Sequence, residues 1–155
     1  MVDLNKLENK REEELNKALE ALHFAFRAVV AKPDAILAER GLSRFHHRLL
    51  YCIGRHPGLS VNELLAILRV SKQSLNAPLR QLTQLGLIES KADPSDRRIK
   101  RLTLTQQGLL LERELSNDQR QRFARAFEIV GLEGEATWHK VMKLLAEDIF
   151  PNLVD

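Results

Sequence analysis

Apolar side chains recur every three or four residues over most of this 155-residue chain, which is the period of an amphipathic helix. Between residues 87 and 104 the pattern changes, because Leu102 and Leu104 alternate with Arg101 and Thr103, as in a strand. The predicted helices cover residues 2–31, 44–55, 71–85, 105–130 and 133–148, with a short helix after Ser60 and a single turn over 34–41. Two strand-like runs, 87–91 and 100–104, are joined by a charged loop over 92–99. The pattern therefore predicts a mainly α fold that contains one β-hairpin.

Capping residues divide the middle of the chain. Ser60 and Glu63 have the spacing of a capping box, and Ser71 is a suitable N-cap for the next helix. Gly86 follows that helix at the position where a left-handed residue usually ends it. The leucines between these caps have helical spacing and are expected to face the core: Leu64, Leu65, Leu68, Leu75, Leu79, Leu82 and Leu85. The order helix, turn, helix, hairpin is that of a winged helix-turn-helix, with a three-helix core and a β-hairpin wing.

The predicted first helix carries an apolar stripe that includes Leu15 and Leu22, and Pro33 with Asp34 is expected to end it. Its first third is mostly charged, so this helix is hard to bury on one small domain and easy to pair with a second copy. A frayed, solvated tail is the alternative. Gly131 is expected to divide the C-terminal region into two helices. The domains predicted are a dimerisation helix over 1–33, a winged helix over 34–108 and dimerisation helices over 109–155.

Charge is concentrated where the second helix and the hairpin are predicted. The whole chain has a net charge of +3, whereas residues 69–101 contain eight Lys or Arg and three Asp or Glu, a net +5 that leaves −2 elsewhere. Polar side chains on the solvent face of a helix of this kind suit base edges and phosphates in a major groove. The predicted contacts on this helix are Ser71, Lys72, Gln73, Ser74, Asn76 and Arg80.

The charged loop of the hairpin predicts a second contact. Asp93-Pro94-Ser95 is turn chemistry, and Asp96-Arg97-Arg98 follows it. An arginine at the tip of such a hairpin can enter a minor groove, where narrow A·T-rich DNA concentrates negative potential. A hairpin tip is also charged when it is merely solvated, but here the charge has one sign. The predicted contacts in the wing are Asp96, Arg97, Arg98 and Lys100.

Residues 59–108 resemble the MarR family of bacterial transcription regulators. The similarity is carried by residues 70–74 at the start of the second helix, by residues 82–88, and by the run from Asp93 to Arg98 that continues into residues 104–108. The Asp-x-Arg motif of the family falls on Asp96 and Arg98. The resemblance implies a homodimer on double-stranded DNA, an arginine in the minor groove, and usually repression that is relieved by a small, often aromatic, ligand.

The chain departs from the family pattern at Ala77-Pro78. The family often has an arginine at the position of Ala77, and here a proline follows. A proline within a helix removes one hydrogen bond and clashes with the preceding turn, so the helix either kinks or differs in its first turn. Sequence preference therefore does not carry over from relatives. Arg69 also stands in the turn where glycine is common.

His46, His47 and Tyr51 lie on the predicted helix over 44–55, which in the family borders the ligand cleft. They could line such a cleft, although residues of these types are more often ordinary core or surface residues. Adjacent histidines point about 100° apart on a helix, so they do not form a metal pair. With a single cysteine, Cys52, no zinc site and no cofactor are predicted. Cys52 is expected to be buried and inert rather than a redox sensor, because a sensor thiol needs access and a lowered pKa.

Composition excludes several classes of protein. No apolar run approaches the ~20 residues of a membrane span, and no signal peptide is visible at the N-terminus. One cysteine fits a reducing, cytoplasmic location. The chain lacks a glycine-rich phosphate loop, a His-Glu-x-x-His motif and a nucleophile elbow, so an enzyme is not expected. Two hypotheses remain: a ligand-responsive homodimeric repressor on a pseudo-palindromic operator, or a winged helix that binds only other proteins.

Overall fold

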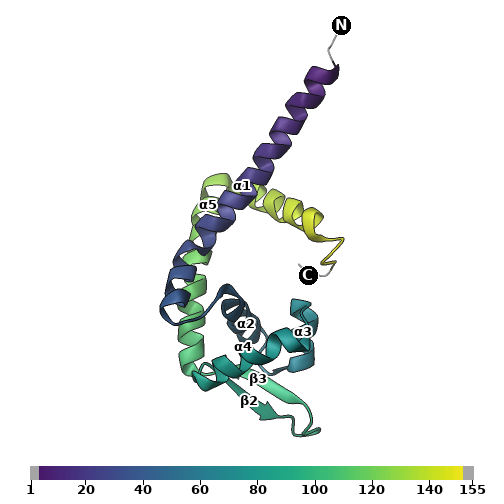
Figure 1. Cartoon of the computed structure of the whole chain (residues 1–155). Coiled ribbons are helices and arrows are strands. Elements are labelled where there is room, and N and C mark those ends of the chain that lie inside the picture. Colours follow the sequence, from purple (N-terminus) through teal and green to yellow (C-terminus); the bar gives the residue numbers. More distant parts are fainter. Residues whose placement is uncertain (1–3, 152–155) are drawn as a thin grey trace. The chain divides into compact units, whose positions relative to one another are not determined.

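The computed structural model describes residues 4–151, which form helices and one small sheet (Figure 1). The elements follow the order α1 (Leu4–Glu39), α2 (Arg44–Arg55), β1 (Leu59–Ser60), α3 (Val61–Leu68), α4 (Lys72–Gln84), β2 (Ile88–Ala92), β3 (Lys100–Leu104) and α5 (Gln106–Ala146). The chain divides into two compact units between Asp118 and Gln119. Residues 2 and 3 of the predicted first helix, and the last four residues of the predicted C-terminal region, lie outside the described residues.

The prediction that Pro33 and Asp34 end the first helix is wrong, because α1 continues to Glu39. Val30, Pro33 and Leu37 are buried on one face of α1, at spacings of three and four residues. Burial of this face offsets the hydrogen bond that the proline ring cannot donate. The predicted turn over 34–41 is therefore the last part of α1. As expected, Gly41 closes it, with a φ of 68°.

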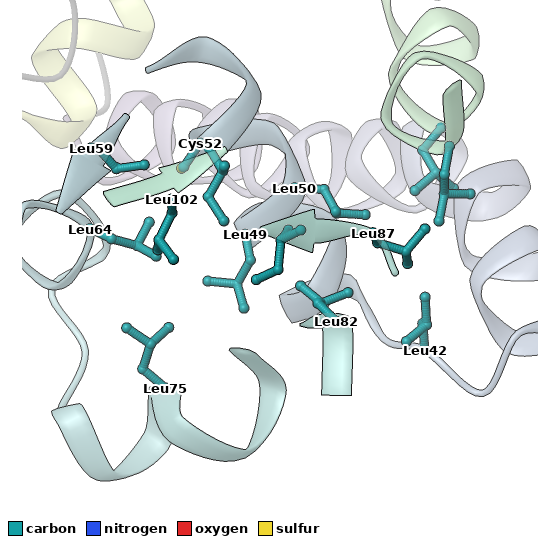
Figure 2. Packing of buried hydrophobic residues seen from close by; sticks show 14 of the residues in the cluster. Leu42, Leu49, Leu50, Cys52, Leu59, Leu64, Leu75, Leu82, Leu87 and Leu102 are labelled. Carbon is teal, nitrogen blue, oxygen red and sulfur yellow. The ribbon is translucent and has the colours of Figure 1, made fainter. Parts of the chain in front are cut away.

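Leucines form the core of the first unit. Figure 2 shows leucines of α2, α3 and α4 converging with Leu102 of β3 and with Leu87, which precedes β2. Leu49, Leu50, Leu64, Leu75 and Leu82 are fully buried. This core holds α2, α3, α4 and the sheet together as the predicted winged helix-turn-helix, so the fold class read from the sequence is confirmed.

The predicted caps of the helix-turn-helix are confirmed. The Ser60 Oγ accepts from the Glu63 amide at 3.1 Å, and the Glu63 carboxylate accepts from the Ser60 amide at 3.3 Å. Gly86, with a φ of 72°, ends α4: its amide donates to Thr83, and the Leu87 amide donates to Leu82, both at 3.0 Å. This pair of bonds is a Schellman motif.

Leu85 does not face the core as predicted, since 47% of it is exposed. Leu85 is the C-cap of α4, where the chain is already turning toward Gly86. Leu87 is buried in its place, because the Schellman turn carries it back onto the last turn of the helix.

The sheet contains one strand that the sequence pattern did not predict. Its order is β1-β3-β2, with both pairs antiparallel. β1 pairs Leu59 with Leu102 and Ser60 with Arg101. The hairpin β2–β3 begins one residue later than predicted at its first strand, at Ile88, and its second strand matches the prediction.

The second unit, from Gln119 onward, consists of helical segments on either side of Gly131. Gly131 has a φ of 76° and a ψ of 179°, so the predicted break in the helix is confirmed. Phe123 and Phe127 lie before the break and Trp138 after it, with ring centroids 5.1 to 5.6 Å apart. At this separation tilted and edge-on aromatic rings attract one another, which holds the two segments together.

Candidate nucleic-acid interface

The polar face predicted on α4 is exposed. Lys72, Gln73, Ser74, Asn76 and Arg80 are all exposed, and so is the N-cap Ser71. Ser71 also holds the helix start, because its Oγ accepts from the Ser74 amide at 3.1 Å and lies 2.8 Å from the Ser74 Oγ. The first turn of α4 is therefore capped by Ser71, and its polar side chains are exposed.

The opposite face of α4 is anchored on the core. Leu75 and Leu82 are fully buried, and Leu79 is partly buried. α4 remains one helix from Lys72 to Gln84 although it contains Pro78. Arg69, which precedes α4 in the turn, has a φ of 52° and adopts the left-handed conformation that favours glycine. The turn between α3 and α4 is thus fixed by backbone conformation and by the Ser71 cap.

The tip of the wing holds Arg98 in a defined geometry. The Arg98 Nε and Nη2 donate to the two carboxylate oxygens of Asp96, at 3.0 and 2.9 Å, and the Arg98 amide donates to the same carboxylate at 3.1 Å. The Arg98 side chain is nevertheless 90% exposed. These hydrogen bonds, those from the side chain first, hold the pKa of Asp96 below its ordinary value and raise the pKa of Arg98. Arg98 is therefore a permanent cation that is exposed and already oriented.

The base of the wing is tied to α3 through Arg101. The Arg101 Nε donates to Asp93 at 2.9 Å, and its Nη1 donates to Glu63 at 3.3 Å. Asp93 also accepts from the amides of Ser95 and Asp96, at 2.8 and 3.1 Å. The hydrogen bond from Arg101, and then those two amides, hold the pKa of Asp93 below its ordinary value.

Sequence reasoning missed this link between α3 and the wing, because it assigned Glu63 to a cap and Asp93 to a turn. The link follows from the register of β1 against β3. β1 pairs Ser60 with Arg101, which brings Glu63 within reach of that arginine. A strand of two residues has no detectable period, so the pairing was not predicted.

Ion pairing changes the charge that the interface presents. Arg98 is paired with Asp96, and Arg101 is paired with Asp93 and Glu63. Lys91 lies 4.0 Å from Glu89. Four other cations of the predicted site are exposed and form no ion pair with a carboxylate of residues 4–151: Lys72, Arg80, Arg97 and Lys100. These four side chains give the interface its unneutralised positive charge, while ion pairing holds the other two arginines in defined positions.

The histidines predicted to line a ligand cleft point to different neighbours. His46 is buried, and its Nε2 lies 2.8 Å from the Gln81 Oε1 of α4. The His47 Nε2 lies 3.1 Å from the Ser116 Oγ of α5, which donates to Glu112 at 2.7 Å. Burial lowers the pKa of His47, although the Glu112 charge opposes this effect. The structure therefore does not bring these two side chains together.

Tyr51, the third predicted ligand residue, is 37% exposed, and the Arg55 guanidinium lies 5.9 Å from the centre of its ring. A cavity of about 570 Å³ lies elsewhere, between the α1–α2 connection, the end of α4 and the start of α5. Its lining includes Arg40, Leu42, Leu87, Leu111 and Glu114.

The remaining chemistry of the described residues is limited. Cys52 is buried as expected, and burial raises the pKa of its thiol, which opposes thiolate formation. Within residues 4–151, no group of three or more His, Cys, Asp or Glu side chains is arranged to hold a metal ion. No helix of this part of the chain is long and apolar enough to cross a membrane.

Comparison with known proteins agrees with the fold. The sequence profile of the MarR family matches residues 40–99. The HTH-type transcriptional regulator PetP of Rhodobacter capsulatus is 42% identical over 136 residues, which cover 88% of this chain and 82% of PetP. Among solved structures, Streptococcus pneumoniae FabT in complex with DNA has a TM-score of 0.76 at 21% identity, covering 87% of this chain and 96% of FabT. A MarR family regulator from Listeria monocytogenes, complexed with 26mer DNA, has a TM-score of 0.69 at 20% identity, covering 84% of this chain and 87% of its own.

The fold and the exposed basic site are those of a winged helix-turn-helix protein. The similarity to PetP and the family match identify the group more closely: this chain belongs to the MarR family of DNA-binding transcriptional regulators. It is therefore a regulator and not an enzyme.

Proposed function

We propose that this protein is a sequence-specific repressor that binds double-stranded DNA as a homodimer. The observation that carries the proposal is the pairing of two features on one unit: the exposed polar face of α4, and an exposed arginine held in a fork at the tip of the wing. FabT and the Listeria regulator, which share the fold, have been solved in complex with DNA. α4 would lie in a major groove and the wing in the flanking minor groove.

The contacts would divide into two kinds. Lys72, Arg80, Arg97 and Lys100 would bind phosphates, because their charges are exposed and unneutralised. Gln73 and Asn76 would read base edges, since side-chain amides pair well with adenine in the major groove. The remaining predicted residues would have supporting roles: Ser71 and Ser74 at the start of α4, and Asp96 beside Arg98.

The homodimer is proposed from the exposed apolar side chains of the terminal helices. On α1, Leu15 is 50%, Leu19 68% and Leu22 50% exposed, at helical spacing. On the last part of α5, Val141, Leu144 and Leu145 are 45, 59 and 64% exposed. Exposed apolar side chains at helical spacing of this kind often mark a protein interface. In this proposal residues 1–33 and 109–155 supply the dimerisation helices, and residues 34–108 bind DNA.

The dimer has a direct test. Leu19→Glu should weaken association about 100-fold or more, because it places a charge in the proposed interface. Lys17→Glu changes the charge more but lies about 200° around the helix, so it should leave the dimer intact. Sedimentation equilibrium measures both, and a monomeric wild-type protein at micromolar concentration would refute the proposal.

Repression and relief by a small aromatic effector are proposed from family membership. The effector would bind beside His46, His47 or Tyr51 and act by preferring a dimer whose two α4 helices are wrongly spaced for the operator. The protein would act in the cytoplasm. A screen of aromatic carboxylates for loss of DNA binding tests the effector.

A second candidate function is a winged helix that binds only other proteins. Ala77-Pro78 favours it slightly, because the family often has an arginine at the position of Ala77. The exposed, forked Arg98 opposes it, since a module without a nucleic-acid ligand gains nothing from that arrangement.

DNA binding by the purified protein distinguishes the two functions. The ligand is the DNA upstream of its own coding region, the competitor is a scrambled duplex, and the salt concentration is varied. Preference for the upstream duplex, with affinity that falls steeply with salt, supports the proposed repressor, and the slope counts the phosphate contacts. Equal binding to both duplexes contradicts sequence-specific recognition. No binding at low salt supports the interaction module.

A further inference from the structure

A buried histidine joins α2 to α4. His46 is 8% exposed, and its two ring nitrogens both have partners. Nδ1 lies 3.0 Å from the Ser43 amide, which donates to it at the start of α2, and 3.0 Å from the Ser43 Oγ. Nε2 lies 2.8 Å from the Gln81 Oε1. Gln81 in turn donates from its Nε2 to the Gly41 carbonyl in the α1–α2 connection, over a longer distance of 3.4 Å.

These partners fix the form of the imidazole ring. Because Nδ1 accepts from a backbone amide, the proton of the neutral ring is on Nε2, which donates to Gln81. The Gln81 amide group then has its oxygen toward His46 and its nitrogen toward Gly41, which satisfies both of its ends. The donor and the acceptor of each hydrogen bond in this chain are thus defined.

The direction of these hydrogen bonds matters because the other side chains that attach α4 to the core are apolar. Leu75, Leu79 and Leu82 attach the helix to the core, and apolar packing sets its depth more strongly than its rotation. Side-chain ends lie about 5–6 Å from a helix axis, so a rotation of about 10° displaces them by about 1 Å. A displacement of that size is enough to break hydrogen bonds to base edges.

Gln81 stands next to Arg80 and five residues after Asn76, so a bond that fixes Gln81 also fixes where those two side chains point. We propose that His46 is a positioning residue for DNA recognition: through Gln81 it sets the rotation of α4, and with it the placement of Arg80 and Asn76. This inference rests on the proposed role of α4 as the helix that reads DNA.

Two substitutions at His46 separate its two hydrogen bonds. His46→Asn keeps an acceptor near the position of Nδ1 but cannot reach Gln81. His46→Gln keeps a donor near the position of Nε2 but loses the acceptor for the Ser43 amide. His46→Asn should weaken binding to the upstream duplex about 5-fold, the equivalent of one hydrogen bond, whereas His46→Gln should stay within about 2-fold of wild type.

Substitutions at Gln81 test the same bond from α4. Gln81→Leu removes the acceptor and should cost about 5-fold in affinity. The double variant of His46→Asn and Gln81→Leu should be no weaker than either single variant, because both remove one interaction. These variants also keep the test valid if a substitution at the buried His46 fails to fold.

Cys52→Ala is the matched control for lost stability. Cys52 is buried on the same helix, α2, and its substitution should lower the melting temperature without changing the affinity for DNA. All affinities are measured below the melting transition, with the scrambled duplex as competitor.

The possible outcomes are distinct. Weaker binding by His46→Asn and Gln81→Leu, with Cys52→Ala unchanged, supports the inference. Wild-type affinity in both of those variants overturns it, as does an equal loss in Cys52→Ala. A wild-type protein that does not prefer its upstream duplex refutes the proposed function instead.

Discussion

α4 and the wing present positive charge to the same proposed ligand, but they hold it in different ways. On α4, Lys72 and Arg80 are exposed and form no ion pair with a carboxylate of the described residues. In the wing, Arg98 is also exposed, yet Asp96 holds its guanidinium in a fork. The backbone of α4 is fixed from below by leucines, whereas the wing loop is fixed by carboxylates that accept from its own amides and arginines.

The difference shows how each part meets the cost of ordering a side chain. Lys72 and Arg80 lose rotamer freedom only when they bind, a cost of up to about 2 kcal/mol for each side chain. Arg98 has lost part of that freedom already, because its fork with Asp96 restricts the side chain before DNA arrives. The arginine of the wing is therefore held in place before it binds, whereas the cationic side chains of α4 remain free to adjust to phosphates.

Truncating a leucine that attaches α4 to the core should give the largest effect of these predictions. Leu82→Ala removes a fully buried side chain and should destabilise the fold by about 2–5 kcal/mol. Leu85→Ala, at the C-cap of the same helix and 47% exposed, should cost less than about 1 kcal/mol. Urea denaturation measures both. Equal losses would mean that burial does not distinguish the two faces of the helix end.

At the wing tip, adjacent arginines allow a matched comparison. Arg98→Ala should weaken operator binding by about 1–3 kcal/mol, roughly 5- to 150-fold, because the arginine is proposed to enter the minor groove. Arg97→Ala should cost only a few-fold, the loss of one proposed phosphate contact. Both side chains are exposed, so the melting temperature should change only slightly in either variant. A smaller loss for Arg98→Ala than for Arg97→Ala would reverse their assigned roles.

The carboxylate that holds Arg98 should have a smaller effect. Asp96→Asn removes a negative charge and the fork but keeps a side-chain oxygen that accepts from the Arg98 amide. Operator affinity should fall about 3-fold, as one hydrogen bond is weakened. Affinity for a scrambled duplex should rise, because the wing becomes more positive. Titrations of the two duplexes at one salt concentration give the ratio, and a ratio equal to that of wild type would show that the fork does not orient Arg98.

The smallest effect is expected from pH. The pKa values of Asp93 and Asp96 lie below the ordinary value of about 3.9, so both carboxylates stay charged and keep their hydrogen bonds above that pH. The stability that they contribute is lost only as the pH falls through their lowered pKa values. NMR titration should show both midpoints below about 3.9. In Arg98→Ala only the Asp96 midpoint should rise, since Arg101 still holds Asp93. A rise in both, or in neither, would contradict this assignment.

Much of the fold follows from local signals in the sequence. The caps at Ser60 and Ser71, the left-handed Gly86 and the break at Gly131 each depend on the conformational preference of one or two residues. Leucines at helical spacing identified most of the core. The exposed face of α4 followed from the same periodicity, because the positions that remain after the leucines are polar.

What could not be predicted depends on contacts between distant residues. Pro33 ends a helix by its local preference, but its burial between Val30 and Leu37 lets α1 continue. The strand at Leu59–Ser60 exists only because β3 pairs with it. Likewise, the bond between His46 and Gln81 joins residues 35 positions apart, and neither residue type signals it.

The most direct test of the proposed mode of recognition is a hydroxyl-radical footprint of the wild-type protein on the duplex from its own upstream region. A homodimer that places α4 in the major groove should protect two tracts centred about one helical turn, roughly 10 bp, apart. The wings should add protection in the minor groove at the outer edge of each tract. Two such tracts with protected flanks are the predicted result. A single protected tract, or two tracts without protection in the flanking minor grooves, would contradict the proposed placement of α4 and the wing.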